Sequence, residues 1–288
     1  MLIIEVVFPV FAIIALGYLL ARFTHLDTKT LSELVVNITS PCLVYVSIAK
    51  REIVAADWLV MGGAAAAIIF GTAVLMELYQ RAAAIRSRGL FLPAMFMNSG
   101  NMALPFSLLA FGAPGFDMAI IFYVTVALLH YSIGVFIAKG RGGFQEIFRL
   151  PLIYAALAGL VSSLFRVQLP SFLFTPVEML ANVAIPLMIL ALGIQLHSLR
   201  VRSVRHAVAG VSIRMGGGFL IAVLFVLLFG IGGLSRKVIF LDSLMPPAVF
   251  NVVLAQKYAA DPDAVASAIV IGTLLSVVVT PLYLFFAT

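Results

Sequence analysis

Long apolar runs recur along the whole chain, and they restrict its fold more than any single motif does. A helix needs about 20 apolar residues to cross about 30 Å of hydrocarbon, and lipid tolerates no unpaired backbone groups. Of the 288 residues, 63% are hydrophobic and 10% are charged, which is typical of a chain that spans a membrane several times. A transmembrane β-barrel would show short alternating strands instead. The sequence therefore predicts an all-α polytopic membrane protein.

Ten segments are apolar enough to be spanning helices, and the connections between them are too short for a soluble domain. We number these spans one to ten in chain order. They are predicted at residues 3–21, 31–49, 58–80, 89–111 and 117–138, and then at 148–165, 173–196, 206–230, 237–258 and 264–286.

Positive charge in the connections predicts the orientation, because Lys and Arg are retained in the cytoplasm. The connections after odd-numbered spans are the richer set: Arg22, Lys29, Arg81, Arg86, Arg88, Lys139, Arg141, Arg149, Arg200, Arg202, Arg205 and Lys257. The other connections hold Lys50, Arg51, Arg166, Arg236 and Lys237. We therefore expect a multi-pass membrane protein with both termini outside. The first span is expected to be an anchor rather than a cleaved signal peptide.

One pattern of Glu, Asn and Pro occurs twice. Glu33, Asn37 and Pro41 in span two have identical counterparts 145 residues later, in span seven. Pro9 and Asp117 also have counterparts, at offsets of 142 and 146 residues. Each half holds five spans, an odd number, so the second half must enter the bilayer from the opposite side. We predict two inverted five-helix repeats, residues 1–140 and 141–288.

Spans four and nine carry the strongest helix-breaking signals. Span four reads Asn-Ser-Gly-Asn between Pro93 and Pro105, and span nine contains Met245 followed by two prolines. Proline removes a backbone donor, glycine permits unwinding, and Asn and Ser compete for backbone hydrogen bonds. Broken helices at membrane depth are tolerated where they line a cavity or are buried in protein. Simple packing kinks are the alternative explanation.

Two such breaks in equivalent positions predict a binding site between them. The N-termini of half-helices carry partial positive charge and free N–H groups, which suit a carboxylate. The residues expected to bind the substrate are Asn98, Ser99, Gly100, Asn101, Pro105, Pro246, Pro247, Asn251 and Arg214.

Two charged residues inside predicted spans leave alternatives open. Arg214 in span eight either balances the substrate anion or pairs with Asp242, or else its side chain extends to the cytoplasm. Asp242 could be only an N-cap near the outer surface. The basic residues form no patch typical of nucleic-acid binding, and no His or Cys pair has metal-ligand spacing. No nucleic acid, metal or cofactor is expected.

The chain resembles the auxin efflux carrier family, which joins the PIN-type plant auxin exporters to many bacterial relatives. The resemblance covers essentially the whole chain, and it implies a location in a bacterial inner membrane. It is carried by residues 9–22, 37–41, 98–105, 185–193, 245–246 and 255–258. The long cytoplasmic loop of the plant exporters is absent.

The resemblance implies a fold like that of bile-acid symporters, in which helices four and nine cross at prolines. It also implies a scaffold of helices one, two, six and seven, which also offers a surface for a homodimer. A transport domain of helices three to five and eight to ten would slide against this scaffold like an elevator. Family members carry small organic anions such as malate, malonate or auxin, and Asn98 stands where the plant exporters place an asparagine near the substrate carboxylate.

Two other functions compete with an organic-anion carrier. A sodium-coupled symporter of the bile-acid type should have a Glu or Gln cluster beside the break in span nine, where residues 244–253 are mostly apolar. An intramembrane enzyme would need a nucleophile beside a base, and Ser99 has no obvious base within helical reach. The protein is therefore not expected to be an enzyme.

Overall fold

The computed structural model describes residues 3–24, 26–50, 55–140, 145, 148–167 and 169–287. Arg51 and Arg141, which enter the charge comparison, lie outside these residues. Among these residues the regular secondary structure is helical, and the only β-pairing there is an isolated bridge between Met97 and Pro247. The expectation of an all-α protein is confirmed.

Helices make up most of the described structure. Their bounds are α1 Ile3–Phe23, α2 Thr28–Leu34, α3 Ser40–Ala49, α4 Ala55–Ala82, α6 Leu104–Leu129, α7 Val135–Lys139, α9 Pro151–Leu164, α10 Ser171–Ser198, α11 Val204–Val211, α12 Gly218–Leu228 and α15 Pro262–Ala287. Among the described residues, seven continuous helical stretches are long and apolar enough to cross a membrane. The length and composition of these helices thus support the prediction of a polytopic membrane protein.

Several of these stretches contain a wide π-type turn instead of regular α-helix. The turns are η1 Val35–Thr39, η2 Ser99–Ala103, η3 His130–Gly134 and η4 Ser212–Gly217. Such turns are rare and frequently occur at functional sites. A different irregularity divides α6, where Gly112 has a φ of 66°, a left-handed conformation that glycine adopts at little cost. Gly112 marks the boundary expected between spans four and five.

The predicted fourth span is interrupted close to the expected position. Its first part is the short helix α5, Phe91–Met95, and Phe96 then has an extended backbone. Helical structure resumes at Ser99, with Asn98 as the N-cap. Pro105 is the second residue of α6, a position where the missing N–H of proline costs little. Pro105 therefore follows the break instead of forming it.

The predicted ninth span is interrupted in the same way. Helix α13 covers Gly233–Ser243 and helix α14 covers Phe250–Lys257, with non-helical backbone between them. Asp242 is the penultimate residue of α13 and is fully buried. The alternative in which Asp242 is only an N-cap near the outer surface is wrong, because α13 begins nine residues earlier, at Gly233.

The two interruptions pair with each other. The N–H of Asn98 donates to the carbonyl of Pro246 at 2.8 Å, and the N–H of Ala248 donates to the carbonyl of Phe96 at 2.9 Å. Backbone groups that leave a helix inside a membrane must find such partners. The two broken segments are thus held side by side at the centre of the protein.

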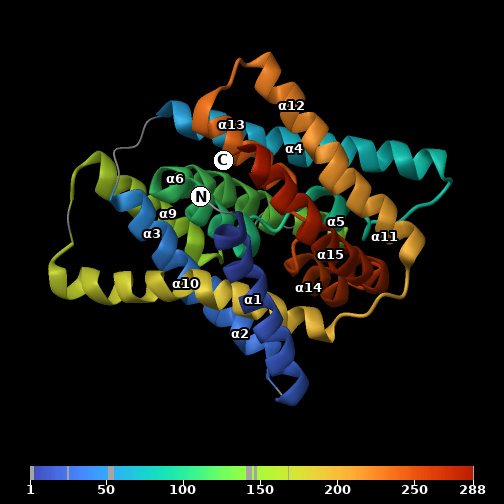
Figure 1. Ribbon diagram of the computed structural model, residues 1–288, viewed down its shortest axis with the longest axis horizontal. Helices are drawn as coiled ribbons and strands as arrows, with labels where there is room; N and C mark the ends of the chain where they lie inside the picture. Colours follow the sequence, from blue (N-terminus) through green and yellow to red (C-terminus); the bar gives the residue numbers. More distant parts are fainter. Residues whose placement is uncertain are drawn as a thin grey trace.

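The helices pack in two sets around this centre (Figure 1). In one set α10 crosses α1 and also packs on α3, which contacts α9. In the other, α4 packs on α6 and α12, α13 packs on α6, and α11 packs on α15. Fewer contacts join the sets, among them those of α10 with η2 and of α1 with α6 and α15.

Candidate functional site

A cavity of about 120 Å³ lies beside the paired interruptions. This exceeds the roughly 10–15 Å³ needed by one water molecule, so the space can hold a small organic molecule. Both broken segments contribute to its wall, as do α2, η1, α6, η3 and α10. The polar lining residues are Ser32, Asn98, Ser99, Asn101, Tyr123, His130, Tyr131 and Gln195.

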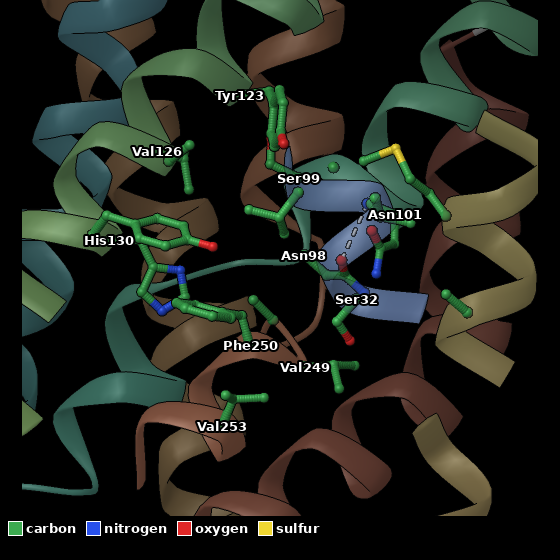
Figure 2. Close-up of a pocket in the computed structure, with 18 of the residues that line it drawn as sticks. Ser32, Asn98, Ser99, Asn101, Tyr123, Val126, His130, Val249, Phe250 and Val253 are labelled. Atoms are coloured by element: carbon green, nitrogen blue, oxygen red, sulfur yellow. Dashed lines mark hydrogen bonds between the residues drawn. The ribbon is translucent and has the colours of Figure 1, made fainter. Parts of the chain in front are cut away.

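Asn98 has the hydrogen-bonding arrangement of a ligand-binding residue. Its side-chain oxygen accepts a 3.3 Å hydrogen bond from the N–H of Asn101, as drawn in Figure 2. This bond caps the helix that begins at Ser99 and fixes the side chain. The Nδ2 amide is buried and has no hydrogen-bond partner, while Asn98 lines the cavity. A buried donor without a partner is costly, and a bound acceptor group would satisfy it.

Aromatic side chains form the opposite wall. Figure 2 shows His130 and Phe250 across the cavity from Asn98 and Asn101. The His130 ring stacks on Phe96 with a centroid distance of 4.1 Å and meets the edge of Phe250 at 5.2 Å. Tyr131 stacks on Phe250 at 4.6 Å. The site therefore combines a polar wall with a flat apolar one, as ligand pockets generally do.

The described lining includes no Lys, Arg, Asp or Glu. A negatively charged ligand would thus depend on N–H groups and helix N-termini, not on a direct ion pair. Helices η2 and α14 both begin at the cavity, at Ser99 and Phe250.

A buried charged group lies directly behind this polar wall. The hydroxyl of Ser99 donates to the carboxylate of Asp242, and Asp242 interacts electrostatically with Arg214. Arg214 is fully buried, so the alternative in which its side chain extends to the cytoplasm is wrong. Its Nη1 donates to the carbonyl of Met95 at 2.7 Å. Arg214 does not line the cavity.

Comparison with known proteins identifies the family of this chain. A family model described as membrane transport protein matches the chain over residues 2–147 and 144–284. The chain belongs to this family. It is the auxin efflux carrier family, whose motifs the sequence carries, and the expected resemblance is confirmed.

Two archaeal relatives of this membrane transport protein are also known only as transporters. An uncharacterized transporter of Methanothermobacter thermautotrophicus is 30% identical, over 97% of this chain and 96% of the relative. An uncharacterized transporter of Methanocaldococcus jannaschii is 29% identical, over 68% of this chain and 67% of the relative. The family and both relatives are described as transporters.

The predicted site residues of this transporter fall into two groups. Asn98, Ser99, Gly100 and Asn101 line the cavity together. Pro246 accepts a backbone hydrogen bond from Asn98, and Pro247 forms the isolated bridge with Met97, so both prolines join the two interruptions. Asn251 is buried behind the cavity and donates through Nδ2 to the carbonyl of Phe96 at 3.1 Å. The predicted site residues that do not line the cavity are Pro105, Pro246, Pro247, Asn251 and Arg214.

The aromatic wall and one polar pair of the transporter were not predicted from the sequence. Tyr123, Tyr131 and Phe250 line the cavity, but aromatic residues in apolar spans carry no signal of function. Gln195 donates to the hydroxyl of Ser32 at 2.7 Å, and both residues line the cavity. A polar side chain inside a predicted span is expensive and usually functional, so Gln195 could have been found from the sequence.

Proposed function

We propose that this protein is a secondary transporter of small organic anions, mono- or dicarboxylates of the malate, malonate or auxin kind. The unpaired Nδ2 amide of Asn98 in the cavity carries this proposal. A carboxylate oxygen accepts strongly from amide N–H groups. The N-termini of η2 and α14 add further donors and a favourable dipole, while the wall of His130 and Phe250 accommodates the apolar part of the substrate.

The proposed topology has ten spanning helices in two inverted five-helix repeats, with spans four and nine crossing at the interruptions. Seven spans would correspond to the long apolar helical stretches, or parts of them, and the other three are short or broken helices in the described structure. These three are span six (α9), span four (which begins with α5) and span nine (α13 and α14). The 145-residue offset of the Glu, Asn and Pro pattern supports the inversion, because five spans per half is an odd number.

The proposed mechanism is alternating access by an elevator movement. The scaffold would be α1, α2, α3, α9 and α10, and the transport domain would be α4–α7 and α11–α15. The packing of the helices into these sets, with fewer contacts between them, supports this division. The cavity lies between the sets, because Gln195 comes from α10 and Asn98 from a broken segment. Sliding one set would carry a bound anion across the membrane.

The proposed location is the inner membrane of a cell, with both termini outside and a homodimer formed through the scaffold. Positive charge in the connections supports the orientation. The scaffold also exposes apolar side chains, such as Phe8 and Leu16 on α1 and Met179 on α10, to which lipid or a second copy would bind.

Uptake into proteoliposomes tests the proposal. Labelled carboxylates of increasing length would be compared with their neutral amides, with sodium and proton gradients imposed separately. We expect saturable uptake of a carboxylate and no uptake of its amide. Equal uptake of the two would contradict anion recognition by Asn98. Uptake that requires a sodium gradient would instead support the alternative, a sodium-coupled symporter of the bile-acid type.

A further inference from the structure

The guanidinium of Arg214 lies at the ends of two half-helices. Its Nη1 donates to the carbonyl of Met95, the last residue of α5, at 2.7 Å, and reaches the carbonyl of Ala94 at 3.5 Å. Its Nη2 reaches the carbonyl of Ser243, the last residue of α13, at 3.5 Å. One side chain thus contacts the carbonyl ends of both helices that stop at the interruptions.

Carbonyls at a helix C-terminus lack intrahelical partners and carry partial negative charge. In carriers with broken helices, such ends and the unwound carbonyls beside them coordinate the coupling cation. Here a protein side chain makes these contacts, and its positive charge is permanent.

The surrounding residues accommodate the buried side chain of Arg214. Arg214 belongs to the π-type turn η4 and is completely buried. A Cβ at Gly218 would collide with Nη2 of Arg214, so the glycine leaves room for the guanidinium. Asp242 interacts electrostatically with Arg214, and Ser99, which lines the cavity, donates its hydroxyl to Asp242.

We propose that Arg214 is a built-in cation that replaces a coupling sodium ion at the paired interruptions, so this carrier works without binding sodium. The inference deepens the proposed function, since it rests on the interruptions being part of the transport site. It assigns Arg214 a positioning role: it stabilises the half-helix ends that place Ser99 and Asn98 in the cavity wall, and it does not touch the substrate.

Sodium binding to the purified full-length protein is the direct test. We expect no saturable binding of radioactive sodium to the wild type. We also expect no difference between sodium chloride and choline chloride in its thermal unfolding midpoint at equal ionic strength. Saturable sodium binding by the wild type would overturn the proposal, and this arm needs no variant.

Chemical rescue of Arg214→Ala is the second test. The substitution leaves the carbonyls of Met95 and Ser243 without a cation, so we expect a lower unfolding midpoint. Guanidinium at low millimolar concentration should restore part of the lost unfolding midpoint, because a cation that binds the folded state stabilises it by mass action. Urea has a similar shape but no charge, so it should not restore the midpoint. Equal responses to guanidinium and urea would contradict a cation site.

Two further variants complete this test. Arg81→Ala is the matched control, since Arg81 is exposed and pairs with Glu77 at 2.6 Å, and it should show no guanidinium-specific response. Arg214→Lys keeps the charge and should retain more stability than Arg214→Ala. If Arg214→Ala does not fold, sodium binding by the wild type decides the question. None of these measurements uses an organic anion, so they stay interpretable even if no carboxylate is transported.

Discussion

The main-chain N–H of Asn98 donates to the carbonyl of Pro246, 148 residues further along the chain, at 2.8 Å. This bond, with that from Ala248 to Phe96, lets each interruption satisfy backbone groups of the other. Unpaired groups would cost several kcal/mol each in hydrocarbon. The bond also fixes the backbone of Asn98, whose side chain lines the cavity. The residue that orients the proposed ligand is thus positioned by the opposite half of the chain.

Asn98→Ala should weaken substrate binding and transport. A hydrogen bond to a charged group contributes about 1.5–3 kcal/mol, and each 1.4 kcal/mol is a factor of ten, so we expect an affinity loss of about ten- to a hundredfold. Concentration-dependent uptake into proteoliposomes measures it. Asn182→Ala, which changes an exposed asparagine on α10, is the control. Unchanged affinity in Asn98→Ala would show that the proposed site is wrong.

Alanine at Gly17 or Gly193 should destabilise the protein. A Cβ at Gly17 would collide with the carbonyl oxygen of Leu190, and one at Gly193 with that of Ile14. These contacts join α1 to α10 backbone to backbone, so the helices would have to separate, at a cost of about 1–3 kcal/mol. The unfolding midpoint of the protein in detergent measures this.

Gly216→Ala is the control for these glycines, because a Cβ there has no neighbour within 4 Å. It should leave stability unchanged or raise it slightly, since alanine favours helix over glycine. A drop as large as that of Gly17→Ala would mean that helix packing is not the cause.

A cross-link between the two sets of helices should stop transport. The rings of Phe11 on α1 and Phe106 on α6 lie 5.7 Å apart, so a cysteine pair at these positions can be joined by a short reagent in a Cys42→Ser background. An elevator movement requires these helices to slide past each other. Transport should fall on cross-linking and recover on reduction.

A control pair for the cross-link lies within a single set of helices, the proposed scaffold. Tyr45 on α3 and Ser162 on α9 are 3.3 Å apart through their hydroxyl oxygens. Cysteines there should cross-link without loss of transport. Full transport in the cross-linked 11/106 protein would rule out the elevator movement.

Asp27 should make a small part of the stability dependent on pH. Thr30 donates its hydroxyl to this carboxylate at 2.5 Å and the N–H of Lys29 donates at 3.0 Å, which lowers the pKa of Asp27 below its ordinary 3.8. Because this pKa is lower in the folded than in the unfolded protein, the charged carboxylate stabilises the folded protein at pH values above the unfolded pKa. This contribution disappears as the pH falls through the lowered pKa of the folded state.

Asp27→Asn tests this, because it keeps a side-chain acceptor for the cap of α2 and removes the titration. The wild type should be the more stable protein near neutral pH, and the difference in unfolding midpoint should shrink below pH 3.8. A difference that does not change with pH would show that the charge of Asp27 is not responsible.

Much of the architecture could be predicted from residue order alone, since lipid imposes simple demands on a chain. Long apolar runs must become helices there, and the polar, proline-rich stretches of spans four and nine must break them. The structure has its interruptions at Phe96–Asn98 and between Ser243 and Phe250. Asn98 to Asn101 line a cavity for the same reason: polar residues at membrane depth need a partner or a cavity.

The surroundings of Arg214, Asp242 and the aromatic residues depend on how distant helices pack together. Asp242 was expected near a helix start at the surface but is buried beside Ser99, because α13 begins well before it. Arg214 lies behind the cavity wall, where it binds carbonyls that two distant breaks bring together. Tyr131 and Phe250 meet in the same way. Local sequence determines where a membrane helix forms and where it breaks, whereas the partner of a buried charge or ring depends on which helices pack together.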